Sequence, residues 1–97
     1  MSENFTVPLR FSGPVPPIGA RIRHYHPWLE DHAVGTVTRV ELRTPWGRFY
    51  RNGAWHNGYR VYLTDCVHWT GEGAWGPVPD TYFDNIAESW EYDTDAT

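Results

Sequence analysis

The clearest strand pattern in the chain is Tyr59-Arg60-Val61-Tyr62-Leu63-Thr64-Asp65. Apolar and polar residues alternate along it with a period of two, as expected of a strand with one buried face. The inward set is Tyr59, Val61 and Leu63, and the outward set is Arg60, Tyr62 and Thr64. This stretch predicts a mainly β fold.

Residues 18 to 25 and 34 to 43 carry related patterns. In the first, the expected inward set is Ile18, Ala20 and Ile22, and the outward set is Arg21, Arg23 and Tyr25. In the second, the inward set changes phase between Val37 and Val40, which predicts a bulge or a strong bend. Residues 26 to 33 are expected to form a loop. Residues 48 to 51 predict a short third strand, and two turn dipeptides, Asn52-Gly53 and Asn57-Gly58, follow it.

The two ends of the chain have different characters. Residues 1 to 17 contain four prolines, so an extended arm is expected, with Phe5, Val7 and Leu9 alternating as an edge strand would. In residues 80 to 91, Asp80 is a good N-cap and apolar side chains recur at helical spacing, which predicts a short C-terminal helix. The alternative is that residues 83 to 86 lead into a final, closing strand.

Three segments in this order resemble a known small fold. They are Pro17-Ile18-Gly19-Ala20-Arg21-Ile22, Gly35-Thr36-Val37-Thr38-Arg39-Val40 and the run from Tyr59 to Asp65. Together they resemble the strand order of SH3-like barrels of the KOW and Tudor type. The resemblance covers about residues 17–65 and implies a barrel of about five strands. We expect residues 1–17 to be a proline-rich arm and residues 18–97 to be a single domain with an acidic C-terminal segment. Such barrels mostly bind proteins or nucleic acids.

Size and composition narrow the class of protein. Ninety-seven residues suffice for one domain with a small core. The single cysteine, Cys66, has no disulfide partner in the chain, which favours a reducing compartment. There is no apolar run long enough to span a bilayer, and the first residues lack the features of a signal peptide. We expect a cytoplasmic protein without a membrane partner, as a monomer or a small homo-oligomer.

Charge is divided unevenly along the chain. All eight basic residues are arginines, and all lie at or before Arg60. The first sixty residues hold four acids, whereas residues 61–97 hold eight acids and no base. The net charge of −4 is therefore +4 followed by −8. We expect the acidic segment from Asp80 onward to lie against the arginine-bearing strands or to shield them.

The arginines on the outward faces are candidates for nucleic-acid binding. They are Arg21, Arg23, Arg39, Arg43 and Arg60, with Tyr25 and Tyr62 beside them. Arginine interleaved with aromatic rings is typical of surfaces that stack on bases and contact phosphates. The alternative is that these arginines pair with Glu41 and with the acidic tail. The acidic total favours that alternative, because dedicated nucleic-acid binders usually carry net positive charge.

Two residue pairs have metal-ligand chemistry. His24 with His26, and Cys66 with His68, each place two ligands two residues apart, and therefore on one face of a strand. Four such ligands suit tetrahedral zinc, but the spacing matches no standard zinc motif. Surface imidazoles without a metal are the simpler interpretation, so we expect neither a metal nor a cofactor.

Catalysis has little support in the sequence. Cys66 with His68 or His32, or Asp65 with His68, could be drawn as a nucleophile and its base. The chain lacks a glycine-flanked nucleophile, a phosphate-binding loop and paired carboxylates. A buried, unreactive Cys66 is the simpler interpretation, and we expect no enzymatic activity.

The aromatic residues give the preferred functional hypothesis. Trp46 and Trp55 flank predicted turns, where burial is least expected, and exposed Trp and Tyr beside Arg are typical of interface hot spots. The alternative is that some tryptophans cap the ends of the barrel. The predicted binding residues are Trp46, Arg48, Phe49, Tyr50, Arg51 and Trp55.

These observations predict a non-enzymatic binding module that acts on a protein partner through an aromatic and arginine surface. A small, acidic, lysine-free chain also suits an accessory protein of a phage or mobile element that targets a host factor. The alternative function is nucleic-acid binding by an SH3-like barrel through its arginine faces.

Overall fold

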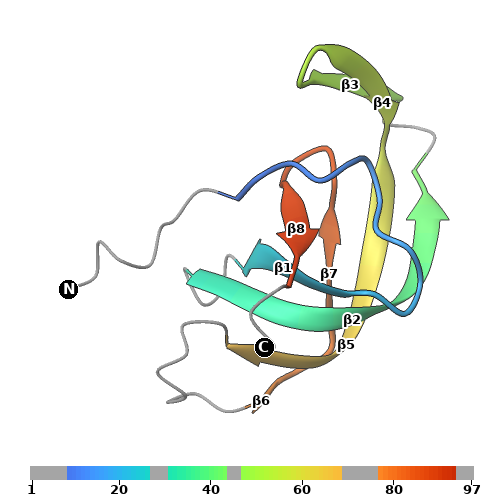
Figure 1. Cartoon of the computed structure of the whole chain (residues 1–97). Helices are drawn as coiled ribbons and strands as arrows, with labels where there is room; N and C mark the ends of the chain where they lie inside the picture. The colour runs from blue at the N-terminus through green and yellow to red at the C-terminus, as the bar shows by residue number, and fades with distance from the viewer. Residues whose placement is uncertain (1–8, 27–30, 44–46, 69–76, 94–97) are drawn as a thin grey trace.

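The described part of the chain is mainly β, and its strands pair antiparallel. The structure is a computed structural model that describes residues 9–26, 31–43, 47–68 and 77–93. Its strands are β1 (Arg21–His26), β2 (Asp31–Leu42), β3 (Arg48–Arg51), β4 (Ala54–Asn57), β5 (Tyr59–His68), β6 (Pro77–Val78), β7 (Thr81–Asp84) and β8 (Trp90–Tyr92). Six of them form one sheet, and β3 and β4 form a separate hairpin at one end of it (Figure 1). The mainly β prediction is confirmed.

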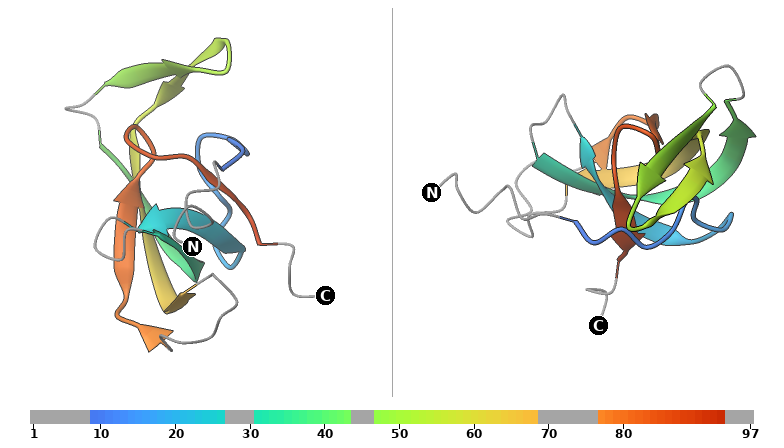
Figure 2. Two further views of the ribbon diagram at one scale, coloured as in Figure 1. Left: turned by 90° about the vertical axis from the view of Figure 1, so that its left-hand side faces the viewer. Right: turned by 90° about the horizontal axis from the view of Figure 1, so that it is seen from above.

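The six-stranded sheet is curved and open. Its order is β6-β5-β2-β1-β8, with β7 also paired to β5. Because β5 is long, β7 pairs with its residues 60–63 and β6 with residues 66–67. The curvature is plain in both views of Figure 2, but within the described residues no ladder closes the sheet into a ring. The fold is compatible with a small barrel, although the strands that the structure describes do not form the closed five-stranded barrel implied by the resemblance.

The expected helix over residues 80–91 is wrong. That segment forms β7, a turn over residues 85–87 and then β8. Phe83 is buried and Tyr82 is exposed, which is the alternation of a strand. Pairing of β7 with β5 therefore outweighs the local N-cap signal at Asp80. The described residues include no helix long and apolar enough to cross a membrane.

Two bulges bend the pairing of β2 with β5. The register shifts between Val34 and Thr36, and again between Val37 and Arg39, which confirms the predicted irregularity. At the first bulge Asp65 adopts a left-handed φ of 55°. Gly35 lies opposite, and a Cβ there would be 2.8 Å from Cys66 Sγ. Glycine at this position lets the cysteine pack close to the β2 backbone.

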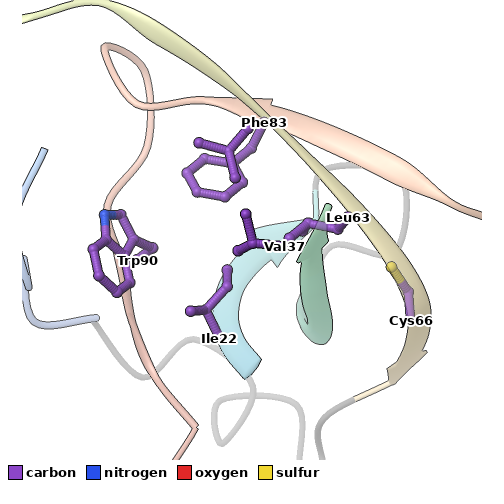
Figure 3. Close-up of a cluster of buried hydrophobic side chains, with 7 residues drawn as sticks. Ile22, Val37, Leu63, Cys66, Phe83 and Trp90 are labelled. Atoms are coloured by element: carbon purple, nitrogen blue, oxygen red, sulfur yellow. The ribbon is translucent and has the colours of Figure 1, made fainter. Parts of the chain in front are cut away.

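A small hydrophobic core lies between the strands of the main sheet. Its buried members are Ile22, Val37, Val61, Leu63, Cys66, Phe83 and Trp90, most of which are labelled in Figure 3. Val61 and Leu63 were expected inside, as was Ile22. Ile18 was expected there too but is exposed, and Arg23 was expected outside but is buried. Strand β1 is thus covered on both faces, which the simple alternation did not predict.

The described part of the N-terminal arm lies along β8. The Ser12 amide donates to the Trp90 carbonyl at 3.1 Å, and the Trp90 indole N–H donates to the Gly13 carbonyl at 2.8 Å. Residues 9–17 are not in a strand, and Phe5 and Val7 of the expected edge strand lie outside the described residues. These two bonds give the buried indole of Trp90 a polar partner and fix the arm over the edge of the sheet.

Asn85 joins three distant parts of the chain through one buried side chain. Its Oδ1 accepts from the Tyr59 amide at 2.7 Å. Its Nδ2 donates to the carbonyls of Pro14 at 2.6 Å and Asn57 at 3.1 Å. The residue is completely buried, so these bonds satisfy both polar atoms of its side chain away from water.

We predict that Asn85→Ala destabilises the protein by about 3 kcal/mol or more, because it removes three hydrogen bonds made by a completely buried side chain and leaves a cavity. Urea denaturation followed by fluorescence measures the change. Exposed Asn57, which contributes its carbonyl to the same network, supplies the control: Asn57→Ala should cost less than about 1 kcal/mol. Equal losses in the two variants would contradict a special role for the Asn85 side chain.

Candidate functional site

The β3–β4 hairpin presents two different faces. Tyr50 lies opposite Trp55, and Arg48 lies opposite Asn57, so these four side chains share one face. All four are exposed, Tyr50 by 62% and Trp55 by 59%. The Tyr50 and Trp55 rings meet edge to face at 5.3 Å, and the Arg48 guanidinium lies 5.3 Å from the centre of the Trp55 ring. We call these four residues the outward hairpin face.

The turn between β3 and β4 sets this arrangement. Asn52 has a φ of 53° and Gly53 a φ of 79°, both in the left-handed region. Two consecutive left-handed residues in a two-residue loop are typical of a type I′ turn, whose twist matches that of the strands. The turn therefore fixes the register that places Tyr50 against Trp55.

The opposite face of the hairpin packs on the body of the protein. Phe49 is buried, and its ring lies 5.5 Å from that of His56. Phe11, from the N-terminal arm, approaches the same imidazole at 5.1 Å. His56 Nε2 lies 3.1 Å from the Arg51 carbonyl, which ties the imidazole to the hairpin backbone.

Arg51 anchors the hairpin to the turn between β7 and β8. Its guanidinium donates to the carbonyls of Asn85 at 2.9 Å, Ile86 at 3.0 Å and Glu88 at 3.4 Å. The same group lies 4.7 Å from the centre of the Phe49 ring. Burial lowers the pKa of Arg51, but a guanidinium remains charged at neutral pH. A cation held by several carbonyls is a strong, directional anchor.

The predicted binding residues therefore divide into two groups. Arg48, Tyr50 and Trp55 lie on the outward hairpin face. Phe49 and Arg51 lie on the packed face, where they hold the hairpin in position. Trp46 lies outside the described residues. The sequence pattern predicted one contact surface here, whereas the alternation of side chains along the two strands separates contact residues from supporting ones.

The arginines of the predicted outward strand faces have acidic partners. The pairs are Arg21–Asp65, Arg23–Glu91, Arg39–Glu41, Arg43–Glu41 and Arg60–Asp84. The Arg60–Asp84 pair is bidentate: Arg60 Nε and Nη2 donate to Asp84 Oδ1 and Oδ2 at 2.9 and 3.2 Å. Asp84 and Glu91 belong to the acidic segment, and their ion pairs confirm that this part of it lies against the arginine-bearing strands. Such pairing leaves these guanidinium groups less available to phosphates.

The histidine and cysteine candidates are partly brought together. His24 and His26 are both buried, with ring centres 6.0 Å apart, and His24 stacks on Phe83 at 4.9 Å. His68 lies two strands away in the same row, because Ala33 pairs with both His24 and His68. Cys66 is buried in the core. Within the described residues, no three His, Cys, Asp or Glu side chains are placed to hold one metal ion.

Cys66 has the environment of a structural thiol. Burial raises the pKa of Cys66, which disfavours the thiolate form that a nucleophile needs. Its neighbours in the core are apolar. A Cys66–His pair acting in catalysis would instead require a lowered thiol pKa and access to solvent.

The surroundings of buried His26 lower the pKa of its imidazole. Desolvation and the nearby His24 lower the pKa of His26, with a smaller contribution from His68, while its backbone bond and Glu88 oppose the shift. His24 Nδ1 lies 3.8 Å from a Glu88 carboxylate oxygen. The neutral imidazole is therefore the form that suits the fold.

Two residues near a surface cavity were missed at the sequence level. Asp80 and Tyr82 border a hollow beside Tyr62 on the outward side of β5 and β7. The strand alternation over residues 81–84 was the signal that could have found them, but the stronger helical spacing of the wider segment obscured it.

Comparison of the chain with protein-family models, curated proteins and solved structures gave no match.

We predict that Arg51→Met loosens the hairpin and lowers stability by about 2 kcal/mol, because partly buried carbonyls lose a charged donor. Hydrogen exchange should show faster exchange of the β3 and β4 amides. Arg48→Met, which removes the same charge from the outward hairpin face, is the matched control and should leave these amides protected. Similar exchange in the two variants would contradict the anchoring role.

We also predict that acid weakens the fold through His26. The unfolded chain binds a proton near the ordinary pKa of 6.5, before the folded chain does. Stability should therefore fall as the pH drops through 6.5, by at most about 1.4 kcal/mol per pH unit for this one proton. His26→Gln should flatten the slope seen in urea denaturation between pH 7.5 and 5.5. An unchanged slope would assign the acid sensitivity to other groups.

Proposed function

We propose that this protein is a non-enzymatic binding module that engages a protein partner through the outward hairpin face. The observation that supports this most directly is the pairing of two highly exposed rings, Tyr50 and Trp55, beside the Arg48 guanidinium. Tyrosine, tryptophan and arginine are the side chains most enriched at binding hot spots. Exposed aromatic area of this kind otherwise lowers solubility.

The rigidity of the hairpin favours binding. The contacts of Arg51 and Phe49 hold the packed face, so the outward face is ordered before any partner arrives. A surface that is already ordered loses less conformational entropy on association. The exposed rings are themselves constrained by their edge-to-face contact. An isolated two-stranded hairpin would lack this advantage, because it is only marginally stable in water.

Charge favours a protein over a nucleic acid as the partner. The chain carries a net charge of −4, and the arginines of the main sheet have the carboxylate partners described above. Within the described residues Arg48 differs, because its guanidinium contacts an aromatic ring and it lies on an exposed face. One cation among exposed rings suits a protein surface better than a run of phosphates.

We predict that Trp55→Ala weakens binding to the partner by about 2 kcal/mol, or roughly thirtyfold, without unfolding the protein. The test is quantitative binding of a partner captured by the wild-type chain, with circular dichroism to confirm folding. Ile18→Ala is the control, because Ile18 is 68% exposed and lies outside the hairpin.

Salt dependence separates the two kinds of partner. Binding through buried aromatic area should change little between about 0.1 and 0.5 M salt, whereas nucleic-acid binding should weaken steeply. Tight, salt-sensitive binding to DNA or RNA that survives Trp55→Ala and is lost in Arg21→Ala with Arg39→Ala would overturn the proposal.

A further inference from the structure

The two edges of the β3–β4 hairpin face different surroundings. Within the described residues β3 and β4 pair only with each other, so each strand has one edge outside the ladder. The Asn57 carbonyl, at the end of β4, accepts from the buried Asn85 side chain at 3.1 Å, so the edge of β4 faces the body of the protein. The edge of β3 lies on the other side of the hairpin, which projects from one end of the main sheet (Figure 1).

The pairing register determines which backbone groups lie on the edge of β3. The Gly58 amide donates to the Gly47 carbonyl at 3.0 Å, so these two residues form a hydrogen-bonded pair. In an antiparallel ladder such pairs alternate with pairs that make no mutual bonds. The amides and carbonyls of Arg48 and Tyr50 belong to the second kind and point away from β4. No hydrogen bond joins them to another residue that the structure describes.

The charge of the hairpin decides which kind of strand suits this edge. Residues 47–58 contain two arginines and no acidic residue, in a chain whose net charge is −4. The Arg48 guanidinium contacts the Trp55 ring, and no carboxylate among the described residues pairs with it. A charged side chain on an edge strand opposes pairing with a second copy of the same edge, because like charges would be brought together. The edge is therefore complementary to an acidic segment.

A strand added to β3 would extend the outward hairpin face. The residue opposite Tyr50 would join the row of Tyr50 and Trp55, where a β-branched or aromatic side chain packs well. The residue opposite Arg48 would join the next row, where a carboxylate pairs with the guanidinium. Because an antiparallel partner runs in the opposite direction, the apolar residue comes before the acid, with one residue between them.

We propose that the partner presents an extended acidic segment, which adds to the edge of β3 as an antiparallel strand. Its apolar residue lies opposite Tyr50 and its carboxylate opposite Arg48. This inference rests on the proposed function and deepens it, because it specifies the form and chemistry of the bound segment. Backbone bonds supply affinity and the two side-chain positions supply selectivity. Since Arg51 already holds the hairpin, little ordering is needed on this side.

The test is an NMR titration of the full chain with a blocked heptapeptide. The peptide carries isoleucine at its third position and glutamate at its fifth, and the other positions are serine or threonine. We expect saturable shifts at the amides of Arg48 and Tyr50, with a Kd of about 1 mM. Solvent exchange of these two amides should slow in the complex, because their N–H groups become hydrogen-bonded.

Matched peptides separate strand addition from contact between side chains alone. Methylation of the backbone nitrogen of the isoleucine or the glutamate blocks a bond to β3 and should weaken binding at least about tenfold. Methylation of the residue between them should change binding less than about twofold, because its N–H points away from β3. Glutamine in place of the glutamate should weaken binding about threefold, as expected for an exposed ion pair.

A charge reversal tests the position of the carboxylate. Arg48→Glu should weaken binding of the glutamate peptide and strengthen binding of the same peptide with lysine at the fifth position. Arg39→Glu makes an equal charge change on the main sheet and should alter both affinities less than about twofold at physiological salt. Circular dichroism confirms that both variants are folded.

Three results would overturn the proposal. They are the absence of saturable shifts, equal effects of methylation at the three positions, and protection of the Arg48 and Tyr50 amides by self-association without peptide. A partner that needs Trp55 but leaves these two amides unprotected would reject strand addition and retain the proposed function. A partner that binds Trp55→Ala as tightly as the wild type would reject the proposed function itself.

Discussion

The buried amide of Asn85 is the interaction on which the rest of the structure depends. Its hydrogen bonds reach the arm at Pro14, the end of β4 at Asn57 and the start of β5 at Tyr59. Its own carbonyl accepts from Arg51. One residue in the turn between β7 and β8 therefore connects the arm, the hairpin and the main sheet. In a domain with a small apolar core, a fully satisfied polar network adds order that packing alone would not give.

This polar junction also explains how an open sheet supports a fixed hairpin. The ladder of the main sheet does not run continuously into β3 and β4, which pair only with each other among the described residues. Arg51 and Asn85 supply the connection instead, through side chain to backbone bonds. The aromatic contacts of Phe49, Phe11 and His56 complete it. The hairpin is held by a few directional bonds, and its outward face remains free for contact.

The sequence predicted the strands well where apolar and polar residues alternate regularly. It failed where contacts between distant segments determine the structure. Val61 and Leu63 are buried as their spacing indicated, and the bulge in β2 follows from its change of phase. Residues 80–91 have helical spacing, yet pairing of Phe83 beside Val61 makes a strand there. The role of Arg51 could not be predicted, because its carbonyl partners belong to a turn 34 or more residues away. Likewise, nothing local distinguishes Asn85 from an ordinary turn asparagine.

The position of the last strands has a consequence for how the chain is made. Phe83, Asn85 and Trp90 complete the core and the polar junction, and their partners lie as early as Ser12 and Pro14. A ribosome releases the chain from its N-terminus, so the early strands emerge without the residues that close over them. The native contacts cannot be completed until residue 92 has left the exit tunnel. Folding is thus expected to be completed only after β8 has emerged, and the early strands are prone to aggregation until then.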